Sequence, residues 1–289
     1  MTILQYHAQN TRQTIQSQCQ LVHEDLGYRP IFVLTTALAL MGIEASHGVL
    51  VTDLLHIGIP HRMKVPSRPY AEFHIWKPLE DPANLIEIDG IICTSPAATF
   101  AHLQPFMLFK ETILLADRMT CRNDKLRVTS HDELVTFFDG KRISGAKSAR
   151  RALRLSQPNT DSASEGLLRL GALESGLPNP KVNHNVVLPS AKNAWLDMAY
   201  EKYGVAMEFH GQQHEFQYEA DTIRMNELAA VDWVTLIAWA NTLHSEHRLR
   251  RYYNQVAAAL HHAGARDFRR PPMDLWTLSD GRRNLGFPD

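Results

Sequence analysis

Residues 195–214 alternate between apolar and polar positions in two runs, and this alternation predicts a β-hairpin. The turn signal Lys-Tyr-Gly at residues 202–204 separates the two strands. If the hairpin is symmetric about this turn, Asp197 and Glu208 lie directly opposite each other, with Cβ atoms about 4.5–5.5 Å apart. The other face is apolar enough to belong to a core, and its residues are Leu196, Met198, Tyr200, Val205, Met207 and Phe209.

The hydrophobic pattern around this hairpin predicts further helices and strands. The polar loop of residues 156–164 precedes them and marks an expected domain boundary. The predicted elements are a helix over 163–176, a strand over 182–188, a helix over 216–231, a buried strand over 234–239 and a long helix over 244–262. The order of residues 163–262 is therefore helix, three strands, helix, strand, helix.

The N-terminal half mixes both kinds of pattern. Residues 1–28 carry apolar positions at helical spacing, which predicts a leading amphipathic helix. A second helix is expected to begin at Thr35 or Thr36 and to end at Gly42. The Asp-Gly dipeptide at residues 89–90 predicts a tight hairpin turn. The other expected elements are strands over 49–57, 71–76, 85–88 and 91–94, and helices over 97–103, 106–119, 131–138 and 144–155.

Composition limits the class of protein. The 289 residues are 44% hydrophobic and 21% charged, which suits a packed core in one large or two ordinary domains. We expect a mixed α/β domain over residues 1–155, a second α/β domain over 156–264 and an Arg- and Pro-containing tail over 265–289. The formal net charge is −1, so a nucleic-acid surface would have to be local.

Cysteines and termini exclude other classes. Cys19, Cys93 and Cys121 are far apart and form no CxxC pair, which argues against a disulfide scaffold or a cysteine zinc site. The N-terminus lacks a basic-then-apolar signal pattern, and the chain has no apolar run of transmembrane length. We therefore expect a cytoplasmic protein without a membrane partner.

Two interpretations fit the acidic face of the hairpin. Like charges placed opposite each other destabilise a strand pair, and a divalent metal between Asp197 and Glu208 would reverse that penalty. His210 shares this face because side chains alternate along a strand. In the second interpretation the hairpin is ordinary and the face is solvated. A zinc site from His184, His210 and His214 fits no standard ligand spacing.

Two other groups of residues carry candidate chemistry. The basic segment 141–154 contains Lys141, Arg142, Lys147, Arg150, Arg151 and Arg154 and no acidic residue between them. Such side chains can contact a nucleic-acid backbone, but the solvated face of a helix is the simpler interpretation. In the N-terminal half, His56, His61 and His74 are expected to be surface or strand histidines rather than ligands.

Several motifs of the C-terminal half together resemble one family. They are S-x-x-E ending at Glu165, G-L-P-x-P from Gly176, Asp197 on the second strand, Glu208 followed by Gly211 and His214, D-x-x-R at Asp221 and Arg224, and Trp233 before the last strand. In this combination, residues 163–262 resemble the Vsr-like endonuclease domains of the PD-(D/E)XK, or restriction-endonuclease-like, superfamily. The segments TTALALMG and DGIICTSPAAT of the N-terminal half resemble, more loosely, AbiEi-like antitoxin and transcriptional-regulator proteins.

The resemblance implies an α/β fold with a restriction-endonuclease-like αβββαβα core after a smaller mixed α/β domain. It also implies metal-dependent endonuclease activity on DNA, in repair or defence, with Mg²⁺ or Mn²⁺ held by Glu165, Asp197 and Glu208. His210 or His214 would act as general base, or as acid to the leaving oxygen. The residues expected to contact DNA are Arg224, Lys147, Arg150, Arg151, Arg154 and Gln212.

The sequence leaves an alternative open. Arg224 has a structural interpretation, as the partner of Asp221 on its own helix. His210 stands where the superfamily's third-strand motif ends in Lys. This departure favours a catalytically inactive DNA-binding regulator or type IV antitoxin-like protein that uses the fold as a scaffold. A pure protein-interaction module is a third class, and neither a protein partner nor an oligomeric state follows from the sequence.

Overall fold

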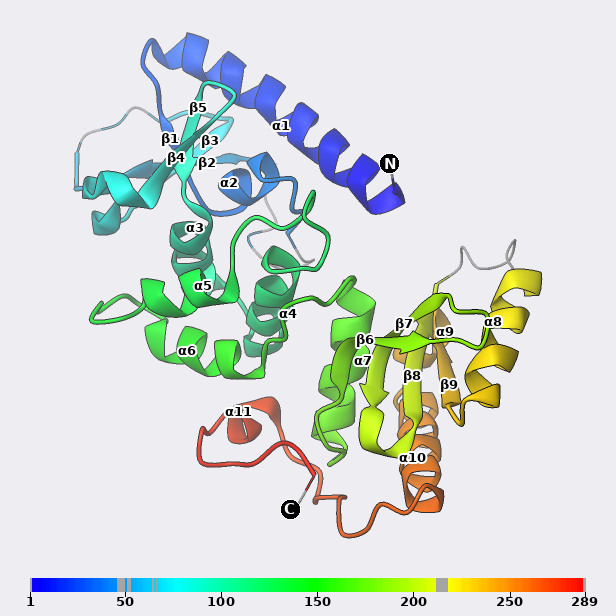
Figure 1. Ribbon diagram of the computed structural model, residues 1–289. Coiled ribbons are helices and arrows are strands. Elements are labelled where there is room, and N and C mark those ends of the chain that lie inside the picture. The colour runs from blue at the N-terminus through cyan, green and yellow to red at the C-terminus, as the bar shows by residue number, and fades with distance from the viewer. Residues whose placement is uncertain are drawn as a thin grey trace. The chain divides into compact units, whose positions relative to one another are not determined.

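The computed structural model describes residues 2–45, 50, 53–63, 65, 67–211 and 218–287. The chain divides into two compact units, residues 1–158 and 159–289 (Figure 1). The division falls within the polar loop of residues 156–164. Each unit has a mixed sheet covered by helices, so the chain has the mixed α/β class that the sequence predicts.

The N-terminal unit is built on a five-stranded sheet of order β3-β2-β1-β5-β4. Its strands are β1 (Ile31–Phe32), β2 (Leu55–Ile59), β3 (Ala71–Ile75), β4 (Leu85–Ile88) and β5 (Ile91–Thr94). β2 runs parallel to β3, and β1 runs parallel to β5, whereas the other neighbours are antiparallel. The helices are α1 (Ile3–Leu26), α2 (Leu34–Leu40), α3 (Pro96–Leu103), α4 (Phe109–Met119), α5 (His131–Phe137) and α6 (Ala146–Leu155), with short 3-10 turns η1 (Lys77–Glu80), η2 (Pro82–Asn84) and η3 (Gln104–Phe106).

Local signals account for several of these boundaries. Thr2 accepts a hydrogen bond from the backbone N–H of Gln5, and the Gln5 side chain accepts one in return, which forms a capping box at the start of α1. Asp89 and Gly90 both have positive φ, as the predicted tight turn between β4 and β5 requires. The Ser95 hydroxyl accepts from the third residue of α3 and caps that helix.

Several N-terminal boundaries differ from the expectation. α2 begins at Leu34, not at Thr35 or Thr36, and the two residues before Val33 form β1, which is too short for hydrophobic periodicity to reveal. The strand expected over 49–57 is β2, which begins at Leu55 and continues to residue 59; residues 46–49, 51 and 52 lie outside the described residues. The helix expected from residue 106 begins at Phe109, because η3 precedes it.

The C-terminal unit follows the predicted element order. Its elements are α7 (Ala163–Glu174), β6 (Lys181–Val187), β7 (Asn193–Tyr200), the turn η4 (Glu201–Tyr203), β8 (Val205–His210), α8 (Tyr218–Ala230), β9 (Val234–Trp239), α9 (Ala240–Leu243), α10 (Glu246–His262) and α11 (Leu275–Leu278). The sheet order is β6-β7-β8-β9, with β8 and β9 parallel and the other pairs antiparallel. The short helix α9 is the element that the sequence did not predict within residues 163–262.

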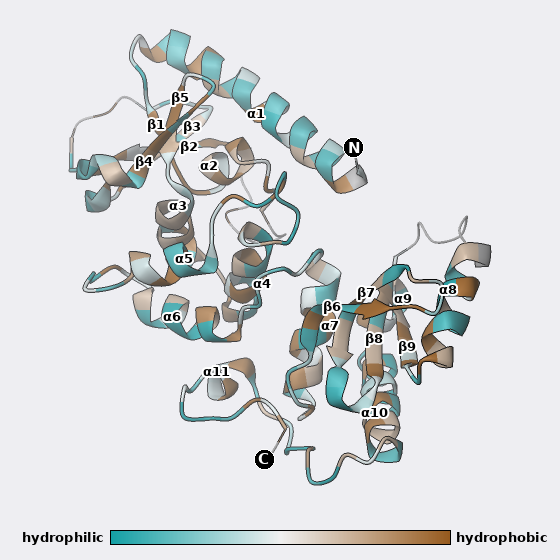
Figure 2. Cartoon of the chain, viewed as in Figure 1, coloured by the Kyte–Doolittle hydropathy of each residue, from teal (hydrophilic) through white to brown (hydrophobic). Residues whose placement is uncertain are grey.

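Helices cover both faces of this second sheet. Leu168 of α7 and Val256 of α10 are buried together with Met198 and Met207 of the hairpin. Leu228 of α8 belongs to a separate buried cluster on the sheet. Figure 2 shows apolar strands inside both units, whereas α1 is largely hydrophilic. The hairpin face that carries the carboxylates is therefore covered and not simply solvated.

The tail after α10 packs against the C-terminal unit. The backbone N–H of Arg270 donates to the carbonyl oxygen of Gly176 at 2.9 Å, and that of Met273 donates to Glu174 at 3.1 Å. Gly176 has a φ of +88°, and a Cβ atom there would lie 1.9 Å from the Arg270 carbonyl oxygen. Glycine is therefore required at this position both for the turn after α7 and for the contact with the tail.

Among the described residues, no helix combines the length and the apolar character that a membrane crossing requires.

Candidate active site

The hairpin has the register that the sequence predicts. Met198 pairs with Met207, and Tyr200 pairs with Val205. One further step along the same register places Asp197 opposite Glu208. The regular pairing ends before this position, and the Asp197 carboxylate instead accepts the backbone N–H of Phe209 at 2.8 Å. The ladder thus opens where the acidic side chains lie.

Glu208 is held by an arginine. Its side chain is only 5% exposed, and its two carboxylate oxygens accept from the two terminal nitrogens of Arg224 at 3.0 and 3.2 Å. Arg224 lies on α8 and also donates to the carbonyl oxygen of Trp195 at 2.8 Å. A two-pronged pair of this kind is both strong and directional. The sequence suggested phosphate or Asp221 as the partner of Arg224. The pairing with Glu208 could not be predicted from it, because this contact joins a helix to a strand that is distant along the chain.

Glu165 adds a third carboxylate from α7. Ser162 caps this helix, and Glu165 stands at the third helical position of the S-x-x-E motif. One Glu165 oxygen accepts from the Ser162 hydroxyl at 2.7 Å, and the other accepts from the backbone N–H of Asp161 at 3.1 Å. The cap therefore positions Glu165 as well as starting the helix.

The three carboxyl groups perturb one another. Burial, and then the charge of Asp197, raise the pKa of Glu165 to about 7. Burial, and then the charge of Glu208, raise the pKa of Asp197 to about 7. Burial also raises the pKa of Glu208, but Arg224 acts in the opposite direction. The structure thus brings Glu165, Asp197 and Glu208 into one electrostatic cluster, and Arg224 pairs with it through Glu208.

The histidines that the sequence placed beside this cluster lie at different positions in the structure. His210 is buried at the end of β8, and its ring meets Trp239 of β9 edge to face at 5.3 Å. His214 and Gln212 lie outside the described residues. His184 is on the edge strand β6, where its Nδ1 is 3.8 Å from a Glu201 oxygen, so it is two strands away from His210.

A compact group of potential metal ligands lies in the N-terminal unit, on strands β2 and β3. In the parts of the chain described above, His56, Glu72 and His74 are the one group of three potential ligands whose donor atoms all lie within 4.8 Å of one another. These residues could hold a metal ion. The strand placement of His56 and His74 is as expected, but their convergence was missed. The Glu-x-His pattern at residues 72–74 could have indicated this group from the sequence, because it puts two potential ligands on one face of a strand.

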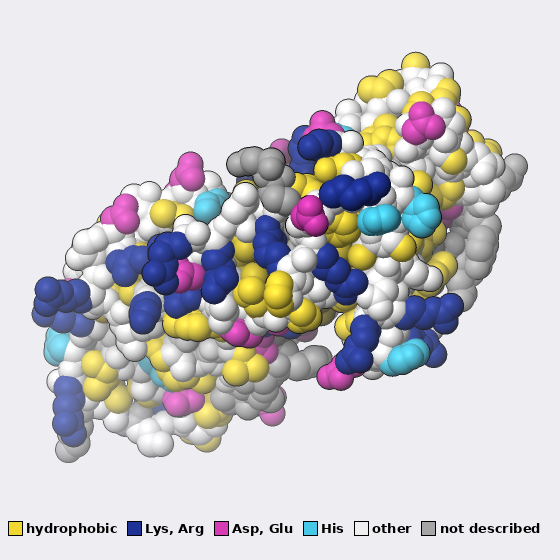
Figure 3. All heavy atoms as spheres, turned by 90° about the horizontal axis from the view of Figure 1, so that it is seen from below, with side chains coloured by type: hydrophobic (Ala, Val, Ile, Leu, Met, Phe, Trp, Pro, Cys, Tyr) yellow, Lys and Arg dark blue, Asp and Glu magenta, His cyan; other side chains and the backbone are white. Residues whose placement is uncertain are grey.

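The basic segment is partly occupied by intramolecular contacts. Arg150 donates to the carbonyl oxygens of Phe138, which caps α5, and of Lys141 in the turn that follows. The Lys141 ammonium lies 3.8 Å from the centre of the Phe137 ring. The buried side of α6 consists of Ala146, Ala149, Ala152, Leu153 and Leu155, and Lys147 and Arg154 are exposed. Figure 3 shows many Lys and Arg side chains in the left half of the picture, where the N-terminal unit is drawn.

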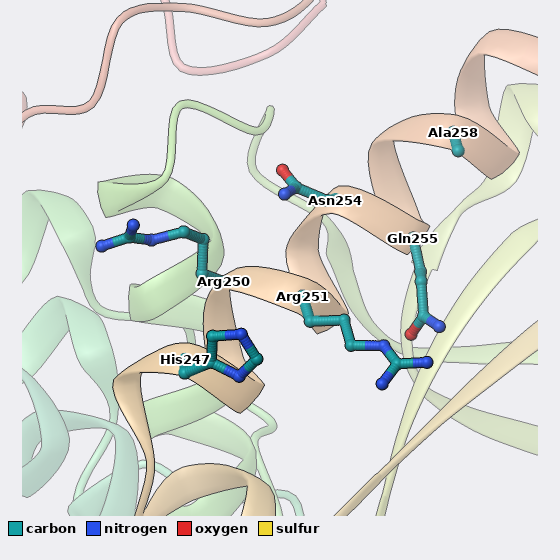
Figure 4. Close-up of a pocket in the computed structure, with 6 residues that line it drawn as sticks. All are labelled: His247, Arg250, Arg251, Asn254, Gln255 and Ala258. Atoms are coloured by element: carbon teal, nitrogen blue, oxygen red, sulfur yellow. The ribbon is translucent and has the colours of Figure 1, made fainter.

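A second basic surface lies on α10 and was not predicted from the sequence. It is a hollow of about 360 Å³, lined by His247, Arg250, Arg251, Asn254, Gln255 and Ala258. Figure 4 shows these side chains along the length of the helix, and all six residues are exposed. Their spacing of three and four residues puts them on one face of the helix. The helix is amphipathic: Tyr252 and Val256 are buried on its other side, which leaves this polar stripe exposed.

Comparison of the chain with protein-family models, with curated proteins and with solved structures gave no match.

Proposed function

We propose that the C-terminal unit is a metal-dependent endonuclease domain that hydrolyses phosphodiester bonds in DNA. The observation that carries this proposal is the cluster of Glu165, Asp197 and Glu208, contributed by α7, β7 and β8, in which two pKa values are raised to about 7. Strongly perturbed carboxyl groups at one place are typical of functional sites. The order helix, three strands, helix, strand, helix supports the restriction-endonuclease-like core.

The donor chemistry of the cluster fits Mg²⁺ or Mn²⁺. All three side chains offer carboxylate oxygens, which hard cations prefer. A divalent ion would also remove the mutual repulsion that raises the pKa values of Glu165 and Asp197. The ion would lower the pKa of a bound water and stabilise charge on the scissile phosphate. Arg224 would orient Glu208, and this positioning role replaces the phosphate contact expected from the sequence.

The basic stripe of α10 supports a nucleic-acid substrate. β8 and β9 are parallel, with Glu208 beside Ile237, and α10 begins shortly after β9 ends. Tyr252 of α10 is close enough to Glu208 and Asp197 for their charges to contribute to its raised pKa, after burial and the neighbouring tyrosines. The stripe residues Arg250 and Arg251 lie on the exposed face of α10, whereas Tyr252 is buried. We propose that Arg250 and Arg251 contact the phosphate backbone of bound DNA. Lys147, Arg151 and Arg154 of α6 form a separate candidate surface on the N-terminal unit.

Cleavage assays with supercoiled, nicked, mismatched and single-stranded DNA in Mg²⁺ or Mn²⁺ test this function. Asp197→Asn and Glu208→Gln should each reduce cleavage by more than about 100-fold, because each removes a charge from the metal-binding cluster. Glu201→Gln is the matched control, since it neutralises an exposed carboxylate at the turn of the same hairpin. Cleavage that survives both variants would reject these residues as the site.

Two observations favour a second function, DNA binding without catalysis. Both oxygens of Glu208 are already bound to Arg224, and the superfamily Lys is replaced by the buried His210. A binding protein would retain DNA in the presence of EDTA and would never cut it. Equal binding by wild type and by Glu208→Gln, with no cleavage of any DNA form, would support this alternative over the endonuclease.

A further inference from the structure

A compact group of ligand atoms lies on one face of the N-terminal sheet, at strands β2 and β3. The parallel register places His56 beside Glu72 and Gly58 beside His74. Because residues two apart on a strand share a face, the three side chains project to the same side. His56 Nδ1 and His74 Nε2 are 2.8 Å apart, and one Glu72 oxygen lies 3.9 Å from the first and 4.0 Å from the second.

The two histidines of the group are shielded from bulk water, whereas Glu72 is open to it. The His56 side chain is fully buried and that of His74 is 11% exposed, whereas Glu72 is 48% exposed. His102 of α3 packs beside His74 and stacks on Trp76 with a centroid distance of 4.3 Å. The group therefore has a hydrophobic and aromatic floor, and a path to solvent through the flexible carboxylate.

Two ring nitrogens in this cluster are unusual. His56 Nε2 and His102 Nδ1 are buried and have no hydrogen-bond partner in the described parts of the chain. Buried polar atoms are normally paired, but neither of these nitrogens is a donor atom of the group, whose histidine atoms are His56 Nδ1 and His74 Nε2.

We propose that His56, His74 and Glu72 form a binding site for a divalent transition metal, with Zn²⁺ as the best fit. Two imidazoles and one carboxylate are a known three-ligand set for zinc, and imidazole nitrogens select against Mg²⁺ and Ca²⁺. Three protein ligands leave a fourth position open to water or a small ligand. This site is separate from the carboxylate cluster and does not depend on the proposed nuclease function.

The geometry is close to that of an occupied site. Bond lengths of about 2.0–2.2 Å in a tetrahedron place ligand atoms about 3.3 Å apart. The two histidine nitrogens share a hydrogen bond of 2.8 Å, which the ion would replace, and they would have to separate slightly. The Glu72 oxygen, at 3.9 and 4.0 Å, would have to approach. Glu72 can do so by side-chain rotation alone because it is half exposed. The bound ion would link β3, the edge strand of the sheet, to its neighbour β2.

The test is titration of Zn²⁺ into the full, tag-free chain by calorimetry, with Co²⁺ absorption as a report on tetrahedral coordination. We expect one Zn²⁺ per chain and visible Co²⁺ bands. His74→Ala should weaken Zn²⁺ binding by more than about 100-fold and Glu72→Gln by about 10- to 100-fold, since even outer-shell partners of a metal contribute on that scale. Glu72→Gln keeps the size of an exposed side chain, so it tests the site without a folding defect.

Two controls assign the binding to this site. His61→Ala removes an exposed histidine near β2 and should leave Zn²⁺ affinity unchanged. Glu208→Gln alters the carboxylate cluster and should also leave it unchanged. The proposal is overturned if wild type does not bind Zn²⁺, or if His74→Ala and Glu72→Gln bind it as tightly as wild type. Loss in Glu208→Gln alone would place the ion at the nuclease site instead.

Discussion

Replacing Asp197 with Asn should stabilise the metal-free protein at about pH 8, although it removes a proposed ligand. The pKa of Asp197 is raised from 3.8 to about 7 by burial and by Glu208. A carboxyl group whose pKa is higher in the folded than in the unfolded state favours the fold only while it is protonated. Its contribution to stability is present below about pH 4 and is lost as the pH rises to about 7.

The size of the effect follows from the raised pKa. A difference of about three pKa units corresponds to about 4 kcal/mol of destabilisation above pH 7. Asn still offers an oxygen to the Phe209 N–H but loses the charge of that hydrogen bond, and part of the penalty is shared with Glu165. We therefore expect Asp197→Asn to raise the free energy of unfolding by about 2 kcal/mol at pH 8, and to change it little at about pH 4.5.

Urea unfolding followed by circular dichroism, with EDTA present, measures this difference at both pH values. The matched control is Glu201→Gln, whose carboxylate is exposed and lies on the same hairpin, and it should behave like wild type at both pH values. Destabilisation of Asp197→Asn at pH 8, or an equal change at the two pH values, would refute the conclusion that the acidic cluster is electrostatically strained.

Three further outcomes are expected. Arg224→Gln should lower the free energy of unfolding by about 2–3 kcal/mol near pH 8, because the buried Glu208 carboxylate loses the arginine that pairs with both of its oxygens. A loss of the same size near pH 4.5 would contradict this cause. Gly176→Ala should release the tail and speed limited proteolysis after α10, and an unchanged cleavage pattern would show that the contact is dispensable. Gln substitutions at Arg250 and Arg251 should weaken DNA binding and reduce the slope of log affinity against log salt by about 2; an unchanged slope would exclude α10 from the interface.

Short-range patterns predicted much of the fold. The alternation of residues 195–210 and the Lys-Tyr-Gly turn were sufficient for the register that places Asp197 opposite Glu208. The sequence offered Ser162 or Ser164 as the cap of the helix that contains Glu165, and Ser162 is the cap. These features depend on neighbours in the chain or on a two-residue period, and local sequence carries that information. The two-residue strand β1 lies below this limit.

Contacts between distant elements required the tertiary structure. The pairing of Arg224 with Glu208 depends on where α8 packs on the sheet, and the closeness of Glu165 to Asp197 depends on the packing of α7. The raised pKa values arise from this burial and proximity, so composition could not reveal them.

The sequence by itself determined the α/β class, the order of the elements in residues 163–262 and the shared face of the two hairpin carboxylates. The tertiary structure decided which charges meet and how far each is buried, and it gathered His56, Glu72 and His74 into one ligand group across two strands. The physical reason is range: hydrogen-bonded turns and side-chain periodicity act over a few residues. Electrostatic coupling and metal-ligand geometry act through space, between segments that only folding brings together.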